Sequence, residues 1–206
     1  GKSSVSKAVA KSLGYTYIDT GAMYRAVALF AINNGIDAKN ETEKLVSRLN
    51  EVEIDIKYTD EGQQIYLLGE NVSKRIREED VSVGASNVAV IPEVRKKLVE
   101  LQRKMAESAN VIMDGRDICS YVLPNADVKV YLTASVECRA MRRFKELEGK
   151  GEACDFEQIK QDIQERDERD MTREIAPLKQ AEDATLIDSS EMGIDDVVKA
   201  IIALTK

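Results

Sequence analysis

The sequence has 206 residues, 43% of them hydrophobic and 33% charged, which is enough apolar material for one compact domain with a small insert. Its formal net charge of −7 excludes a protein that coats nucleic acid through bulk positive charge, although a local basic pocket for a small anion stays open. The absence of histidine excludes His-based acid–base catalysis, Ser–His–Asp triads and histidine metal sites.

Three cysteines, Cys119, Cys138 and Cys154, lack the CxxC spacing and are odd in number. This pattern argues against a disulfide framework or a structural zinc site and favours a reducing compartment. No apolar run approaches the roughly 20 residues of a membrane span. We therefore expect a cytoplasmic protein that engages neither a membrane nor nucleic acid.

The first part of the chain alternates helical and strand patterns. Asn40-Glu41-Thr42-Glu43 resembles a capping box, and the period-two alternation that follows it predicts an antiparallel hairpin, interpreted as an inserted subdomain. In chain order we expect a helix that stops at Gly14, a strand at 15–18, a helix at about 22–33, a helix that the box at 40–43 opens and that runs to about 49, and strands at 52–58 and 64–68 joined by a turn at 60–62.

The second part adds short apolar runs that come just before loops or helices, a pattern typical of buried parallel strands. Strands that alternate with helices predict an α/β fold with a doubly wound parallel sheet and helices on both faces. We expect strands at 111–114, 128–132 and 184–187, and helices from about 78 to before Pro92, from there to about 105, and at 135–147, 155–170 and 194–204.

Gly1-Lys2-Ser3-Ser4 leads directly into the first predicted helix. It matches the last four positions of a phosphate-binding loop, in which helix N-terminal amides and a lysine hold nucleotide phosphates. Lys2 would reach the β- and γ-phosphates, and Ser3 would offer its hydroxyl to Mg²⁺. The alternative is an ordinary helix start. The first glycine of such a loop and the strand before it are missing, so we expect that the chain has lost its native N-terminus.

Asp19-Thr20-Gly21-Ala22-Met23-Tyr24-Arg25 lies between a predicted strand and a helix, where open α/β sheets place ligands. Thr20 and Arg25 could both hold an anion there. Taken alone, the motif is explained better by an exposed arginine that pairs with a nearby carboxylate.

Asp114-Gly115-Arg116-Asp117 directly follows an apolar strand. At this position Asp114 is suited to hold Mg²⁺ or its waters, and Arg116 offers a planar fork to phosphate. Asp117 could accept hydrogen bonds from an exocyclic amine. The alternative is a tight turn, because Asp-Gly is a strong turn signal.

Glu165 to Arg173 is densely charged. On a helix, Arg166, Arg169, Asp170 and Arg173 would share one face. They would form an arginine clamp that closes on phosphates, with Gly149 and Gly151 as hinges of a lid. A solvated helix with surface ion pairs is the alternative.

Together these segments resemble the bacterial cytidylate kinases, nucleoside monophosphate kinases of the P-loop class, over essentially the whole chain. Each matching stretch is weak alone, and their order makes the resemblance specific. The stretches are GKSS at 1–4, DTGAMYRAVAL at 19–29, SNVAVIPEVRKKLVELQR at 86–103, DGRDI at 114–118, ADVKVYLTAS at 126–135, ERDERDMTREIAPL at 165–178 and DATLIDSS at 183–190. Cys119-Ser120-Tyr121 departs from the small glycine-containing segment more usual in the family.

The resemblance implies transfer of a phosphoryl group from ATP, with Mg²⁺, to CMP or dCMP in pyrimidine nucleotide metabolism. It implies that Gly1, Lys2, Ser3 and Ser4 bind ATP, and that Ser3 and Asp114, directly or through water, serve the metal. It implies that Lys2, Arg116, Arg166 and Arg173 are catalytic. It places Thr20, Tyr24, Arg25, Ser86, Arg95, Arg116, Asp117, Arg166, Asp170 and Arg173 at CMP: Arg25 and Arg116 on the phosphate, Ser86, Arg95 and Asp117 on cytosine, Asp170 on the ribose, and Arg173 as a clamp.

The resemblance also implies a division of labour along a monomeric chain. Residues 1–39, 111–147 and 173–206 would form the core, 40–110 the CMP-binding domain with its hairpin insert, and 148–172 a helical lid. We expect Arg25, Arg95, Arg116 and Arg173 to converge on one cleft.

Other functions compete with this hypothesis. One is a P-loop kinase for another small acceptor, such as UMP or a non-nucleotide alcohol. Another is an inactive nucleotide-binding module, to which the incomplete loop at the start points. A GTPase-like switch is disfavoured, because the sequence contains no N-K-x-D guanine signature.

Overall fold

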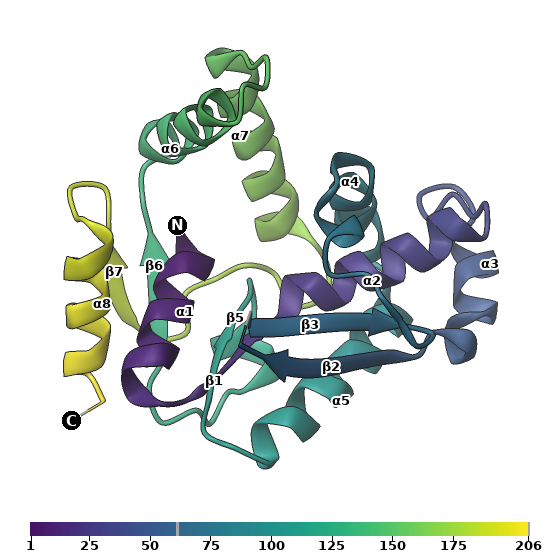
Figure 1. The fold of residues 1–206 in the computed structure, drawn as a ribbon, viewed down its shortest axis with the longest axis horizontal. Coiled ribbons are helices and arrows are strands. Elements are labelled where there is room, and N and C mark those ends of the chain that lie inside the picture. Colours follow the sequence, from purple (N-terminus) through teal and green to yellow (C-terminus); the bar gives the residue numbers. More distant parts are fainter. Residues whose placement is uncertain (61, 206) are drawn as a thin grey trace. The chain divides into compact units, whose positions relative to one another are not determined.

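The computed structural model describes residues 1–60 and 62–205 (Figure 1). The chain divides into two units. The central unit is Thr16–Gly115, and the outer unit combines Gly1–Tyr15 with Arg116–Lys206. No helix within the described ranges has both the length and the apolar character that a membrane crossing requires.

The central unit contains a parallel strand pair, a small antiparallel sheet and the helices that cover them. Its elements are β1 (Thr16–Asp19), α2 (Thr20–Asn33), α3 (Thr42–Ser47), β2 (Ile54–Thr59), β3 (Gly62–Leu67), β4 (Glu70–Asn71), α4 (Glu79–Val88), α5 (Pro92–Glu107) and β5 (Val111–Asp114), with single 3₁₀ turns at Leu49–Glu51 and Arg75–Arg77. The hydrogen-bonded order of the antiparallel sheet is β2-β3-β4. The predicted hairpin is confirmed, although Glu61 of its turn lies outside the described residues.

β1 and β5 pair in parallel, and their register places Asp19 opposite Asp114. Each of these aspartates is the last residue of its strand, so the carboxyl ends of two strands bring two acids together. α2 begins at once after Asp19, whose carboxylate accepts the amide of Ala22 at 3.0 Å and so caps the helix. The sequence motif at 19–25 therefore joins a strand end to a helix start.

Most residues of α2 are buried, as expected for a helix that is apolar on nearly all of its faces. It packs against α4, α5 and β3, and Met23 and Leu98 have no exposed surface. The core of the central unit thus fixes the helix that carries Tyr24 and Arg25.

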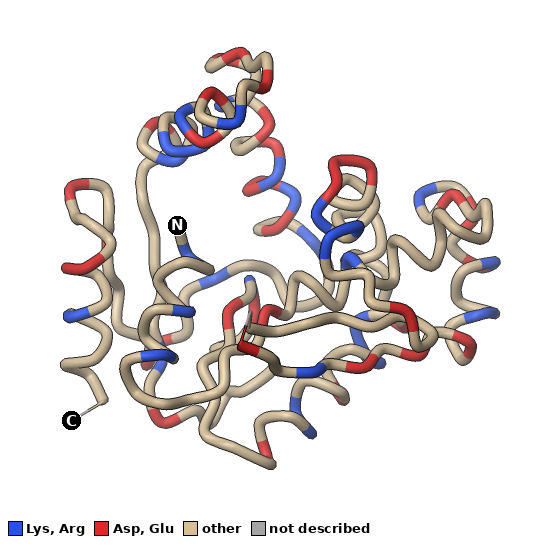
Figure 2. The backbone as a smooth tube through the Cα atoms, viewed as in Figure 1, with Lys and Arg blue, Asp and Glu red and all other residues tan. Residues whose placement is uncertain are grey.

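The outer unit holds a second parallel pair, β6 with β7, in which Val130 lies opposite Thr185. α1 packs against α8, and α6 packs against α7. Figure 2 shows basic and acidic residues interspersed along α6 and α7. The elements are α1 (Lys2–Leu13), a π-helical turn (Ile118–Val122), β6 (Val130–Thr133), α6 (Val136–Gly149), α7 (Phe156–Thr172), β7 (Thr185–Asp188) and α8 (Ile194–Ala203).

The predicted α/β class is confirmed, with parallel strands, helices and a small antiparallel sheet. Several predicted helix ends are confirmed as well. Gly14 ends α1 in the left-handed conformation at φ 68°. Ser135 and Asp155 cap α6 and α7, each accepting the amide three residues ahead. The three cysteines are free.

The predicted capping box at 40–43 is wrong. α3 begins at Thr42 without a side-chain cap, because the nearby polar groups turn to Asp37 instead. The side-chain amide of Asn40 donates to the Asp37 carboxylate at 2.6 Å, and Glu41 accepts the Asp37 amide at 2.9 Å. Short polar side chains compete for local backbone partners in this way, so the helix start uses a turn rather than a box.

At Gly84, α4 packs closely against α2. A Cβ at Gly84 would lie 3.2 Å from the Ala28 Cβ, whereas one at Gly149 would meet nothing within 4 Å. We predict that Gly84→Leu lowers the free energy of unfolding by about 1–3 kcal/mol through overpacking. Gly149→Ala is the control and should leave stability unchanged or raise it slightly. Urea denaturation measures both, and equal stability of the two variants would contradict close packing at Gly84.

Candidate functional site

The start of α1 combines the backbone amides of a helix N-terminus with positive charge. Gly1 is the N-cap and makes no side-chain cap bond, and the first turn contains Lys2 and no acidic residue. Lys2 and Ser3 are half-buried, and Ser4 is exposed. A cation at a helix N-terminus opposes the helix dipole, so this arrangement is costly for the helix alone but suited to an anion.

Arg142, on α6, adds to this positive charge. Its Nη1 lies 3.8 Å from the position that a Cβ at Gly1 would take, and its Nη2 donates to the carbonyl of Ser189 at 2.7 Å. Sequence reasoning missed Arg142, because an arginine within a densely charged helix looks like an ordinary solvated residue.

In the central unit, Asp19 holds two arginines. Its Oδ2 accepts hydrogen bonds from Arg25 Nη2 at 3.3 Å and from Arg77 Nη2 at 2.9 Å. Burial is the main cause that lowers the pKa of Arg25; the negative charge of Asp19 opposes this effect, and the positive charge of Arg77 adds to it. The sequence pointed to Arg25 but not to Arg77, which comes from a turn 58 residues away from Asp19.

Asp114 is tied to the start of the same helix. The Thr20 hydroxyl donates to the Asp114 carbonyl at 2.7 Å, and the Tyr17 hydroxyl donates to the Asp114 carboxylate at 3.2 Å. Gln63, from β3, accepts the backbone amide of Asp19 at 2.8 Å. The inserted antiparallel sheet therefore braces the point at which β1 becomes α2.

Arg95 is fixed deep inside the central unit, with 1% of its surface exposed. Its Nη1 donates to the carbonyl of Ala89 at 3.0 Å, and its guanidinium carbon lies 5.8 Å from the centre of the Tyr24 ring. Ser86 is half-buried on α4. A buried guanidinium held by a carbonyl and an aromatic face is positioned for directional hydrogen bonding.

The outer unit brings four predicted residues into one network. Arg116 Nε donates to Asp170 Oδ2 at 2.8 Å. Arg173 Nη2 lies 3.6 Å from Asp117 Oδ1, and Arg173 Nη1 lies 3.9 Å from Asp170 Oδ1. Arg116 and Asp117 are thus linked to the charged segment at 165–173, although the two are about fifty residues apart in the sequence.

The prediction that Arg173 shares a helical face with Arg166, Arg169 and Asp170 is wrong, because Arg173 lies just outside the helix. α7 ends at Thr172, and Arg173 is its C-cap residue with an extended backbone, at ψ 142°. The Arg173 Nε then donates to the carbonyl of Ala176 at 2.7 Å. Arg166 and Asp170 remain on α7, one turn apart. The chain turns at Arg173 and so directs its guanidinium towards Asp117.

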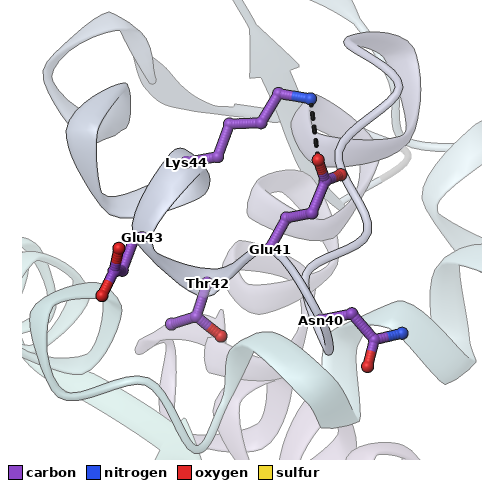
Figure 3. A pocket seen from close by; sticks show the side chains of 5 residues that line it. All are labelled: Asn40, Glu41, Thr42, Glu43 and Lys44. Atoms are coloured by element: carbon purple, nitrogen blue, oxygen red, sulfur yellow. Dashed lines mark hydrogen bonds and ion pairs between the residues drawn. The ribbon is translucent and has the colours of Figure 1, made fainter.

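A surface hollow at Asn40–Lys44 contains none of the predicted site residues (Figure 3). The figure shows Lys44 paired with Glu41, whose carboxylate lies 3.1 Å from the Lys44 ammonium group. Lys44 and Glu41 neutralise each other in an exposed ion pair, so the hollow is not our candidate for the functional site. The convergence of Arg25, Arg95, Arg116 and Arg173 on one cleft stays a prediction.

The parallel α/β fold, the helix start at Lys2 and the clustered arginines are consistent with a P-loop kinase. Comparison with known proteins narrows this class. The family model described as cytidylate kinase matches residues 1–206.

Curated relatives carry the same name. A "Cytidylate kinase" of Caldicellulosiruptor bescii is 49% identical over 204 residues, covering 99% of this chain and 90% of the relative. That of Caldicellulosiruptor saccharolyticus is 50% identical over 204 residues, with the same coverage. That of Anoxybacillus flavithermus is 46% identical over 206 residues, covering 100% of this chain and 91% of the relative. The chain belongs to the cytidylate kinase family.

Asp19 gives a direct test of the site's construction. We predict that Asp19→Ala lowers the free energy of unfolding by about 2 kcal/mol, because it removes both the α2 cap and the partner of Arg25. Asp19→Asn keeps an acceptor for the Ala22 amide and should lose less. Thermal or urea denaturation measures both variants, and an unchanged stability of Asp19→Ala would rule out this role.

Proposed function

We propose that the chain transfers the γ-phosphoryl group of ATP to CMP or dCMP, giving ADP and CDP or dCDP, through the residues named below. The observation that carries the reaction is the family match over the whole chain. The residue roles rest on the resemblance and on the local geometry of each unit.

The ATP phosphates would bind at Gly1, Lys2, Ser3 and Ser4, where amides of the first turn of α1 and the Lys2 ammonium group attract phosphate oxygens. The oxygen donors of Ser3 and Asp114 suit Mg²⁺, a hard cation that binds few protein ligands and keeps phosphate oxygens and water. Asp114 would act directly or through water. Bound with ATP, the metal would neutralise charge on the transferred group.

The CMP phosphate would bind to Arg25 and Arg116, with Thr20 nearby. Both guanidiniums are now paired with carboxylates, Arg25 with Asp19 and Arg116 with Asp170. Planar guanidinium forks match phosphate oxygens well, so an incoming phosphate offers better partners than a single carboxylate oxygen. Asp170, released from Arg116, would then accept a ribose hydroxyl, with Arg166 and Arg173 around the phosphates.

Ser86, Arg95 and Asp117 would read the base, with Tyr24 packed beside Arg95. Cytosine carries an amino donor at C4 where uracil carries an acceptor. A carboxylate such as Asp117 favours the donor, and an arginine suits the ring carbonyl and N3. A site built from buried hydrogen bonds discriminates strongly, because the wrong base leaves polar groups unpaired.

The remaining assignments follow the same proposal. Residues 40–110 would serve as the CMP-binding domain and 148–172 as a lid, with the core formed by 1–39, 111–147 and 173–206. The protein would act as a monomer in the cytoplasm. Its three free cysteines support a reducing compartment.

A coupled assay of ADP production tests the reaction. We predict ATP turnover that depends on CMP or dCMP and is much weaker with UMP. Turnover with UMP equal to that with CMP would favour the kinase for another acceptor, and no acceptor-dependent turnover would favour the inactive binding module.

Asp117→Ala tests the base-reading role. We predict that it lowers the selectivity for CMP over UMP by about 10-fold, the cost of one lost hydrogen bond to a charged group. The KM for ATP should change less. Asp55→Ala, at an exposed position of β2, is the matched control. Equal losses with CMP and UMP would contradict the role of Asp117.

A further inference from the structure

Arg77 is the feature of the central unit that neither the sequence motifs nor the residue roles above use. It ends the 3₁₀ turn Arg75–Arg77 that follows the antiparallel sheet. Ile76, in the middle of this turn, has no exposed surface and anchors the turn against α2 and α4. The turn therefore has a fixed place, and the direction of its arginines is set by the fold.

The two arginines of this turn point to different partners. Arg75 makes a two-pronged contact with the exposed Asp80, at 2.7 and 2.6 Å, and also pairs with Glu78 at 3.1 Å. Arg77 instead reaches Asp19, whose side chain is only 7% exposed, at 2.9 Å. Arg75 is thus saturated by surface acids, whereas Arg77 shares one buried carboxylate with Arg25.

Arg25 and Arg77 each donate one hydrogen bond to the same oxygen of Asp19, so Asp19 accepts only a few of the N–H groups that the two guanidiniums offer. Within the described residues, the buried Nε of Arg25 has no hydrogen-bond partner. The side chain of Arg77 is 52% exposed, so a ligand can reach it from solvent. The positive charge of Arg77 also lowers the pKa of Arg25, although burial is the larger cause. A dianionic group with several acceptor oxygens would relieve both deficits.

Asp19, which pairs with Arg25 and Arg77, is fixed by hydrogen bonds of its own. Its other oxygen accepts the Ala22 amide at 3.0 Å, and Gln63 accepts the Asp19 amide at 2.8 Å. Asp19 therefore keeps Arg25 and Arg77 close together before any ligand arrives, which reduces the cost of ordering them on binding.

We propose that Arg77 binds the phosphate of the monophosphate acceptor together with Arg25, and that Asp19 is the positioning residue that holds the two guanidiniums as a pair. This rests on the proposed function, because the acceptor is a nucleoside monophosphate only in that reaction. An ion pair with a purely structural role is the competing explanation, and it predicts no dependence on the phosphate.

The test compares the affinities for CMP and for cytidine, measured by calorimetry without ATP. We expect Arg77→Ala to weaken CMP binding by about 10- to 100-fold, the usual range for loss of hydrogen bonds to a charged group, and to leave cytidine binding unchanged. Arg75→Ala, from the same turn, is the matched control and should change neither affinity.

Two further variants separate charge, geometry and folding. Arg77→Lys keeps the charge without the planar fork and should recover part of the CMP affinity. It also serves if Arg77→Ala does not fold. Asp19→Asn should reduce the preference for CMP over cytidine in the same direction as Arg77→Ala, a readout that a purely structural role would not move.

The outcomes distinguish this proposal from the reaction itself. If Arg77→Ala matches Arg75→Ala, or if CMP and cytidine lose affinity equally, Arg77 does not bind the phosphate. If Arg77→Ala does not fold, Arg77→Lys takes its place: the proposal is overturned if Arg77→Lys loses no more CMP affinity than Arg75→Ala, or if it loses CMP and cytidine affinity equally. If wild-type protein prefers CMP to cytidine through Arg77 but shows no CMP-dependent ADP production, the anion site stands and the proposed kinase reaction fails.

Discussion

Two shared carboxylates, one in each unit, hold two pairs of arginines in place. In the central unit Asp19 contacts Arg25 and Arg77. In the outer unit Asp170 contacts Arg116 at 2.8 Å and lies 3.9 Å from Arg173. A charged side chain that leaves water needs an opposite charge and hydrogen bonds, and one aspartate provides these for two arginines while leaving further donors available.

This constraint explains why the strand ends matter. The parallel pairing of β1 with β5 places Asp19 and Asp114 side by side, and the chain enters α2 directly after Asp19. The antiparallel insert then supplies Gln63 to the same point. Packing around α2 is therefore coupled to the position of Arg25. Such a site suits phosphoryl transfer, which needs positioning and positive charge more than a general base, and a chain without histidine can perform it.

Local signals in the sequence predicted local structure well. Gly14, Ser135 and Asp155 end or cap their helices as expected, because these interactions span only a few residues. The predicted capping box at 40–43 does not form, because Asp37, just upstream, forms hydrogen bonds with the side chains of Asn40 and Glu41. The prediction of a shared helical face that ends at Arg173 was wrong because α7 stops one residue earlier. Arg77 and Arg142 escaped notice because their partners lie far away in sequence. Long-range pairing leaves no periodic signal, so only the fold reveals it.

The central claim is that a bound monophosphate takes over guanidiniums that carboxylates hold in the unliganded protein. A crystal structure with CMP measures this most directly. The account predicts that phosphate oxygens replace or join Asp19 on Arg25 and Asp170 on Arg116, with Asp117 near the cytosine amine. CMP bound with its phosphate in solvent, and with the Asp19–Arg25 and Asp170–Arg116 contacts unchanged, would contradict it.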